Sequence, residues 1–272
     1  MNRHFILPDT QVKKGVPLDH FDWIGAAIAE YKPSHLIHLG DHYDMPSLSA
    51  WDGPGSLGME GARYEDDISS GNEALERLHR AMGSFKCQKT ILRGNHEFRI
   101  RRAVETSPKF SGTIGEHHFN DKRLGWQPVE YFHGSPGTKI IDGVCYAHYF
   151  ANPNTGKAIG GTITNRLAKI GTSFVQGHCQ GLLQGNVQYA TGIIRHGIVA
   201  GSAYLHDESY KGHANAHWRG VVVLNEVRNG QFCEMPLTLD YLCRKFERTS
   251  LARFLQRKYR NAKERFSLAS AA

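Results

Sequence analysis

The chain has 272 residues, 40% of them hydrophobic, which fits one large domain or two small ones with a sizeable core. It contains no apolar run long enough to cross a bilayer, and no signal peptide is visible, so we expect an intracellular, cytoplasmic protein without a membrane partner. Its five cysteines are scattered and form no CxxC pair, which argues against a disulfide framework or a structural zinc site.

The formal charge of +7 is concentrated near the C-terminus. Between Arg244 and Arg265 there are nine Lys or Arg and two Glu, so this segment alone accounts for the excess. An apolar stripe at helical spacing predicts a basic amphipathic helix within 241–272, attached to a domain over 1–240. The helix could dock on the domain with a solvated basic face, or it could bind a polyanion such as nucleic acid. The stripe comprises Leu251, Phe254, Leu255, Tyr259, Ala262 and Phe266.

Strands and helices are predicted to alternate in the first part of the chain. Hydrophobic periodicity predicts strands at 4–7, 36–39 and 89–92, and helices at 18–31 and 68–82. Residues 45–63, rich in Gly, Ser and Pro, predict a long active-site loop. Right-handed crossovers would make the sheet parallel and bring the loops after its strands together at one edge.

The later part of the chain predicts shorter elements. Residues 106–137 look irregular, and we interpret them as an insertion near the site. A hairpin is expected around the Asp142-Gly143 turn, and a helix opens at Gly160-Gly161, where free N–H groups could hold a phosphate. A further strand is expected at 173–176. The strands expected to form a second sheet half packed on the first lie at 187–189, 193–200, 220–227 and 231–235.

Polar side chains of metal-ligand type follow the predicted strands. Carboxylate and amide oxygens suit hard cations, and imidazole suits Mn, Fe or Zn. Each residue taken singly is more often structural than a ligand, but the ordered set at one sheet edge predicts a site for two cations. The set comprises Asp9, Gln11, Asp41, Asn95, His148, His178 and Gln180.

These residues stand in motifs that resemble the five ordered motifs of the calcineurin-like metallophosphoesterases. The resemblance spans residues 9–180 and implies an α/β fold, a four-layer α/β/β/α sandwich of two mixed β-sheets. It also implies a hydrolase with a two-metal centre. The compact chain is similar to phage and bacterial members, including the repair-nuclease branch, which implies a bacterial or phage-encoded protein. The motifs are Asp9-x-Gln11, Gly40-Asp41-x-x-Asp44, Arg93-Gly94-Asn95-His96-Glu97, His148 and Gly177-His178-x-Gln180.

The resemblance assigns roles position by position. Asp41 would bridge the two metals. One metal site would be completed by Asn95, His148 and His178, and the other by Asp9, Gln11 and Gln180. His96 would be the acid that protonates the leaving oxygen, and Asp44 would orient it. Arg93 and His42 are expected to contact the substrate.

Gln11 and Gln180 depart from the family pattern, because each replaces a histidine of the same metal site. An amide oxygen is a harder, weaker and neutral ligand compared with imidazole. This site would therefore favour Mn²⁺ or Mg²⁺ over Zn²⁺. We expect two divalent ions, with Mn²⁺ favoured and Mg²⁺, Fe or Zn²⁺ as alternatives.

The resemblance implies hydrolysis of a phosphodiester or phosphomonoester, with a nucleotide or nucleic acid favoured, by attack of a metal-bound hydroxide. Met45 stands where the protein-phosphatase branch has arginine, which disfavours a Ser/Thr protein phosphatase. Two alternatives stay open. The glutamines favour a catalytically weak or inactive interaction scaffold, and the basic tail favours a nucleic-acid-binding protein without chemistry. The sequence does not set the oligomeric state.

Overall fold

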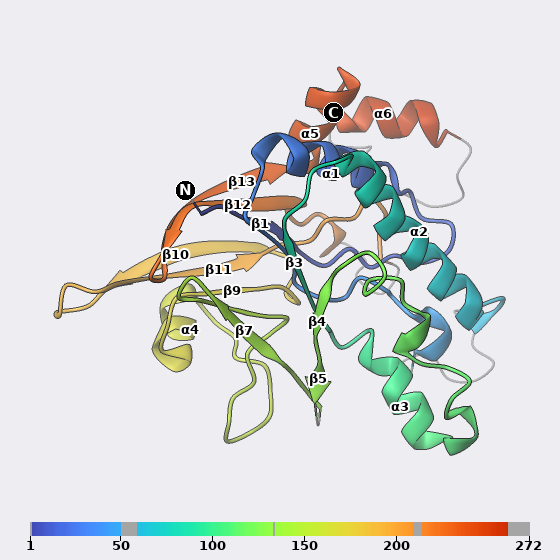
Figure 1. Cartoon of the computed structure of the whole chain (residues 1–272), viewed down its shortest axis with the longest axis horizontal. Coiled ribbons are helices and arrows are strands. Elements are labelled where there is room, and N and C mark those ends of the chain that lie inside the picture. Colours follow the sequence, from blue (N-terminus) through green and yellow to red (C-terminus); the bar gives the residue numbers. More distant parts are fainter. Residues whose placement is uncertain (1, 50–58, 133, 209–213, 261–272) are drawn as a thin grey trace.

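The computed structural model describes residues 2–49, 59–132, 134–208 and 214–260. Over these residues, six α-helices accompany a six-stranded sheet, a five-stranded sheet and a two-stranded ribbon (Figure 1). The predicted α/β class is therefore confirmed. None of the helices in these ranges is both long and apolar enough to span a bilayer.

The larger sheet has the strand order β13-β12-β1-β2-β3-β4. The strands β1 to β4 run parallel to one another. β12 pairs antiparallel with β1, and β13 pairs antiparallel with β12. The bounds are β1 (His4–Leu7), β2 (His35–His38), β3 (Gln88–Leu92), β4 (Gln127–Val129), β12 (Gly220–Arg228) and β13 (Gln231–Thr238).

The expectation that 220–227 and 231–235 belong to a second sheet is wrong. β12 pairs directly with β1, where Phe5 lies opposite Val223. Val221 to Leu224 are all fully buried, so β12 is covered on both faces. A strand of this kind belongs inside a sheet, between two neighbours and two apolar layers.

The second sheet has the order β10-β11-β9-β8-β7. The hairpin predicted around Asp142-Gly143 is present as β7 and β8, and β10 extends well beyond the predicted 187–189. A small ribbon of β5 (Tyr131–Phe132) and β6 (Ser135–Pro136) lies apart from both sheets. The bounds are β7 (Thr138–Ile141), β8 (Val144–Ala147), β9 (Phe174–Gln176), β10 (Leu182–Gln188) and β11 (Ile194–Ala200).

The segment 106–137 is more regular than predicted. It follows α3 (Phe98–Thr106) and contains two 3₁₀ turns before β4, which pairs in parallel with β3. β4 is an edge strand of three residues and tolerates Pro128 for that reason. In the predicted 45–63 loop, the short 3₁₀ helix Pro46–Leu48 is described, and residues 50–58 lie outside the described ranges.

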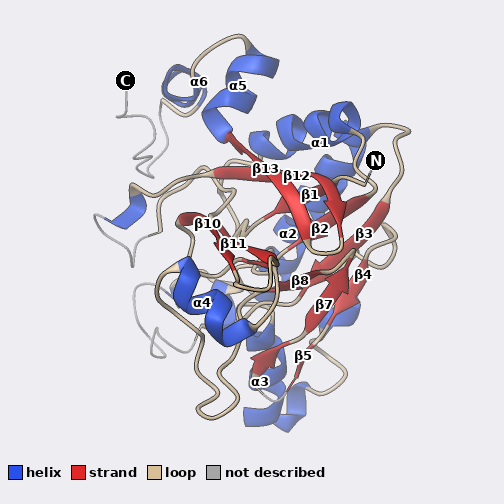
Figure 2. Cartoon of the chain, turned by 90° about the vertical axis from the view of Figure 1, so that its left-hand side faces the viewer, coloured by secondary structure: helices blue, strands red, loops and turns tan. Residues whose placement is uncertain are grey.

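Apolar residues pack on both faces of the larger sheet. Side chains alternate along a strand, so Phe5 of β1 faces α1 (Asp19–Tyr31) and α2 (Tyr64–Met82), whereas Ile6 faces the second sheet. A third cluster joins the outer face of the second sheet to α4 (Ile163–Ile170). Figures 1 and 2 show α1 and α2 on one side of the sheets and α4 on the other.

In its described part, up to residue 260, the basic C-terminal segment forms two helices instead of one. α5 (Leu239–Glu247) and α6 (Leu251–Lys258) are separated by Arg248, whose φ of 59° ends α5. Phe254 packs edge-on against Trp23 of α1, with ring centroids 5.1 Å apart. The described part of this segment is thus docked on the domain, as Figure 2 shows. Ala262 and Phe266 of the predicted stripe lie outside the described residues.

Candidate metal centre

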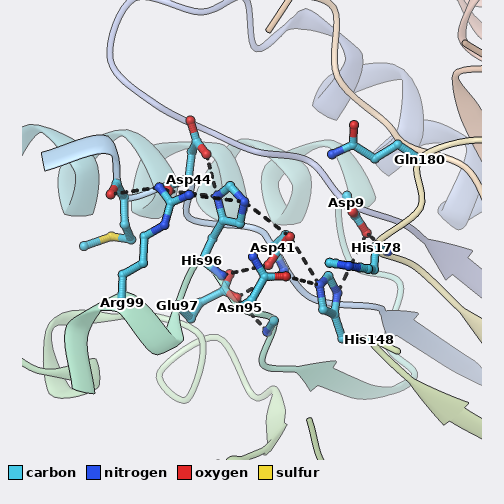
Figure 3. Close-up of polar contacts among 12 residues, drawn as sticks. Asp9, Asp41, Asp44, Asn95, His96, Glu97, Arg99, His148, His178 and Gln180 are labelled. Carbon is cyan, nitrogen blue, oxygen red and sulfur yellow. Dashed lines mark hydrogen bonds and ion pairs between the residues drawn. The ribbon is translucent and has the colours of Figure 1, made fainter. Parts of the chain in front are cut away.

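The loops that follow five strands meet at one edge of the two sheets. The strands β1, β2 and β3 are followed by Asp9, Asp41 and Asn95, and the strands β8 and β9 by His148 and His178. Figure 3 shows that these side chains point toward one another. The structure therefore brings together the five strand-end residues of the predicted set, from both sheets.

The centre of the group is electron-rich. The ligand atoms of Asp41, His148 and His178 all lie within 4.8 Å of one another. His148 Nδ1 lies 2.9 Å from the Leu39 carbonyl oxygen, so Nδ1 carries a proton and donates it. In the neutral imidazole, Nε2 is then an acceptor, yet it faces Asp41 Oδ2 at 3.2 Å and Asn95 Oδ1 at 3.0 Å. Three acceptors that converge in this way require a proton or a metal cation between them.

The pKa values reflect the same concentration of negative charge. Burial opposes ionisation of Asp41, but the imidazoles of His148 and His96 outweigh it and hold the pKa of Asp41 well below its usual range. Burial lowers the pKa of His148, but the Asp41 carboxylate outweighs this effect and raises that pKa to about 10. A position that holds a proton so firmly attracts a divalent cation for the same electrostatic reason.

Asp9 supplies a second point of attachment for a cation. Its Oδ1 accepts the backbone N–H of His178 at 3.0 Å, whereas its buried Oδ2 has no hydrogen-bond partner among the described residues. Burial raises the pKa of Asp9 to about 7, against the effect of His148. Gly177 permits the close approach, because a Cβ there would lie 2.4 Å from Asp9 Oδ1. A buried carboxylate oxygen without a donor is a typical metal ligand.

The two glutamines differ in position. Gln11 is buried, and its backbone N–H donates to the carbonyl oxygen of Asp41 at 2.8 Å. The side-chain oxygen of Gln180 accepts the Tyr204 hydroxyl at 3.0 Å, and in Figure 3 no dashed line joins its amide to another side chain drawn. Gln180, one of the residues that the resemblance groups with Asp9, thus has its side-chain oxygen engaged by Tyr204. The ligand roles of both glutamines stay predictions.

His96 lies beside the centre with its ring fixed by Asp44. His96 Nδ1 is 2.6 Å from Asp44 Oδ1, and His96 Nε2 is 3.7 Å from Asp41 Oδ2. Burial lowers the pKa of His96, but Asp41 and Asp44 outweigh it and raise that pKa to about 8. Lys13, 3.2 Å from Asp44 Oδ2, helps to keep Asp44 ionised. The arrangement leaves a protonated Nε2 facing the centre near neutral pH.

Glu97 has a role that its place in the motif did not reveal. Its buried carboxylate accepts the backbone N–H groups of Asp41, His42, Tyr43 and Gly94 at 2.6–3.1 Å. These bonds hold the Asp41 loop in its positive-φ conformation. Gly94 allows this fit, since a Cβ there would lie 2.0 Å from Asp41 Oδ1. Glu97 is therefore the anchor of the loop that carries Asp41.

Arg99 is a site residue that the sequence analysis missed. Its Nη1 donates to the carbonyl oxygens of Asp44 at 2.8 Å and Met45 at 3.2 Å, and its Nη2 lies 3.5 Å from His96 Nε2. Figure 3 shows the guanidinium next to His96. The available signal was its place on the first turn of α3, three residues after His96. The side chain of Arg99 thus connects α3 to the loop that carries Asp44.

The two predicted substrate contacts lie in the interior. His42 is fully buried, with Nδ1 2.8 Å from Thr10 Oγ1 and Nε2 2.9 Å from the Gly71 carbonyl oxygen. Arg93 is 1% exposed and forms ion pairs with Glu116 and Asp121, each at 2.6 Å. Because neither side chain reaches solvent, we assign both to the support of the loops and not to substrate binding.

Comparison of the chain with protein-family models and with curated proteins finds no match in either. The function of this chain must therefore be inferred from the geometry and chemistry of this site.

Proposed function

We propose that this chain is a metal-dependent phosphoesterase, a hydrolase of phosphodiesters or phosphomonoesters. The observation that carries the proposal is the convergence of Asp41 Oδ2 and Asn95 Oδ1 on His148 Nε2, at 3.2 and 3.0 Å, at a position that binds a cation or a proton. The order of the apolar clusters, with helices, sheet, sheet and α4 in succession, supports a four-layer α/β/β/α sandwich as its fold.

The residues present fit a pair of divalent cations. Two carboxylates, a carboxamide and two imidazoles form a mixed oxygen and nitrogen donor set, which suits Mn²⁺ and also accommodates Mg²⁺, Fe or Zn²⁺. The partnerless Oδ2 of Asp9 gives the second ion an anchor. When bound, the ions would supply Lewis-acid chemistry that activates water and neutralises phosphate charge.

The side chains around the cations have separate tasks. His96 holds a proton on Nε2, facing the centre, where a leaving oxygen would need it. Asp44 fixes the ring through Nδ1. Arg99 carries a partly exposed guanidinium beside His96 and would donate to a phosphate oxygen.

The test is turnover by the full chain loaded with Mn²⁺, with bis(4-nitrophenyl) phosphate as diester and 4-nitrophenyl phosphate as monoester. Asp41→Asn and His148→Asn should abolish turnover, and His117→Gln, at an exposed histidine, should leave it unchanged. A wild-type rate no higher than that of Asp41→Asn would instead favour the inactive scaffold. The hydrogen bond between Gln180 and Tyr204 is the observation that favours the inactive scaffold.

A separate feature of the surface favours a nucleic acid as substrate or partner. Arg244, Arg248 and Arg253 line a hollow of about 640 Å³ at the turn between α5 and α6. A protein that neutralises phosphates with arginine binds more weakly as salt rises. Changing all three arginines to alanine should weaken binding to a duplex oligonucleotide and flatten its salt dependence. Equal affinity of the variant and the wild type would exclude this surface as the binding site.

A further inference from the structure

A second group of ligand-type side chains lies at the other end of the strands. His4 begins β1, His35 begins β2, and Asp142 occupies the turn between β7 and β8. Their ligand atoms all lie within 4.8 Å of one another. Because the opposite ends of β1 and β2 lead to Asp9 and Asp41, this group is separated from the candidate metal centre by the length of the strands.

The group joins the two sheets. His4 and His35 are direct neighbours in the parallel ladder, and their ring centroids are 4.8 Å apart. His4 is two residues from Ile6, so its side chain shares the face that packs on the second sheet. There His4 Nε2 lies 3.0 Å from Oδ2 of Asp142, which belongs to the second sheet's hairpin.

Each side chain is held in place by a neighbour. His4 Nδ1 lies 2.6 Å from the hydroxyl of the buried Tyr146, and His35 Nδ1 lies 3.2 Å from the Ser34 hydroxyl. In metal sites, a ligating histidine generally donates its other ring N–H to such a fixed partner. The Asp142 carboxylate is held as well, because its Oδ2 accepts the Asn2 side-chain amide at 3.0 Å, and its backbone carbonyl oxygen accepts the N–H of Gly230 at 2.9 Å.

We propose that His4, His35 and Asp142 bind a Zn²⁺ ion that ties the two sheets together at this edge. Two imidazoles and one carboxylate favour zinc over Mg²⁺ or Ca²⁺, and water can complete a tetrahedral set. His4 would bind through Nε2 while its Nδ1–H donates to the Tyr146 hydroxyl. The Asp142 side chain, 29% exposed, gives the ion access from solvent. The proposal does not depend on phosphoesterase activity.

The test is the number of zinc ions bound per full chain after equilibrium dialysis against Zn²⁺. Elemental mass spectrometry measures the zinc content. His35→Gln should bind one ion fewer than the wild type, and the exposed-histidine variant His117→Gln should match the wild type. The same loss should occur in an Asp41→Asn background, which separates this site from the candidate metal centre. If His35→Gln fails to fold, Asp142→Asn replaces it with the same expected loss. Equal zinc content in the wild type and the folded variant would overturn the proposal.

Discussion

Asp44 and His96 form a buried pair in which the Nδ1–H of the imidazole donates to the carboxylate across 2.6 Å. The two residues are separated by 52 positions in sequence, and they meet because the loops after β2 and β3 lie side by side. The contact fixes the rotation of the ring and presents Nε2 to Asp41. An imidazole outside the proposed set of metal ligands is thus positioned beside the candidate metal centre.

Loss of the Asp44 charge should reduce turnover while leaving the metals bound. In Asp44→Asn the side-chain oxygen can still accept from His96, but it no longer stabilises the imidazolium. We expect turnover of a diester to fall by about 10–100-fold, as for other partners that orient a site histidine. The measurement is kcat together with Mn²⁺ content. The control is Glu105→Gln, at an exposed carboxylate of α3.

The acid role that we propose for His96 predicts a dependence on the leaving group. A nitrophenolate leaves without a proton, whereas the alkoxide of a dinucleotide needs one. His96→Asn should therefore slow hydrolysis of a dinucleotide by about 100-fold or more, and that of the nitrophenyl diester by much less. Equal losses for the two substrates would show that His96 acts by charge or position and not by proton transfer.

Arg99 should act on the phosphate through its guanidinium. Arg99→Lys keeps the positive charge but loses the planar fork, so we expect a raised KM and a lower kcat/KM, by about tenfold. Arg102→Ala removes an exposed arginine from the same helix and should change neither constant. Initial rates over a range of diester concentrations give both values, and equal constants for Arg99→Lys and the wild type would exclude the contact.

Buried neutral histidine should make the fold sensitive to acid. Burial lowers the pKa of His20 to about 3, although Asp19 nearby opposes the shift. In the unfolded chain this pKa is about 6.5, so below that pH the unfolded state binds the proton first. The free energy of unfolding should therefore decrease as the pH falls, by up to about 1.4 kcal/mol per pH unit.

Urea unfolding in EDTA measures this dependence. The free energy of unfolding of His20→Gln should decline less between about pH 6.5 and about pH 5 than that of the wild type, because the variant lacks the shifted group. The control is His117→Gln, at an exposed histidine. An identical decline in wild type and His20→Gln would mean that His20 does not titrate as its burial requires.

The position of the site could be predicted from sequence because it follows from local rules. Asp9, Asp41 and Asn95 each follow an apolar run, and parallel strands place the ends of such runs at one edge. The same reasoning located His148 and His178. The α/β class and most helices of the first half follow from hydrophobic periodicity in the same way.

The remaining features depend on contacts between distant parts of the chain. The apolar pattern of β12 marks it as buried, but it does not say whether its neighbour is β1 or a strand of the second sheet. β4 has three residues, too few for a periodic signal. Arg99 and Glu97 act through backbone groups of the 41–45 loop, which only the folded chain brings near. The break at Arg248 lies before the apolar stripe, which begins at Leu251, so the stripe gave no sign of the separate helix α5.

The most direct test of the metal centre is an anomalous difference map from a crystal of the full chain soaked in Mn²⁺. We predict a peak bonded to Asp41 Oδ2, Asn95 Oδ1 and His148 Nε2, and a second peak about 3.5–4 Å away, shared through Asp41 and reached by Asp9. A map without a peak between Asp41 and His148, from a crystal whose wild-type chain is intact, would contradict the account.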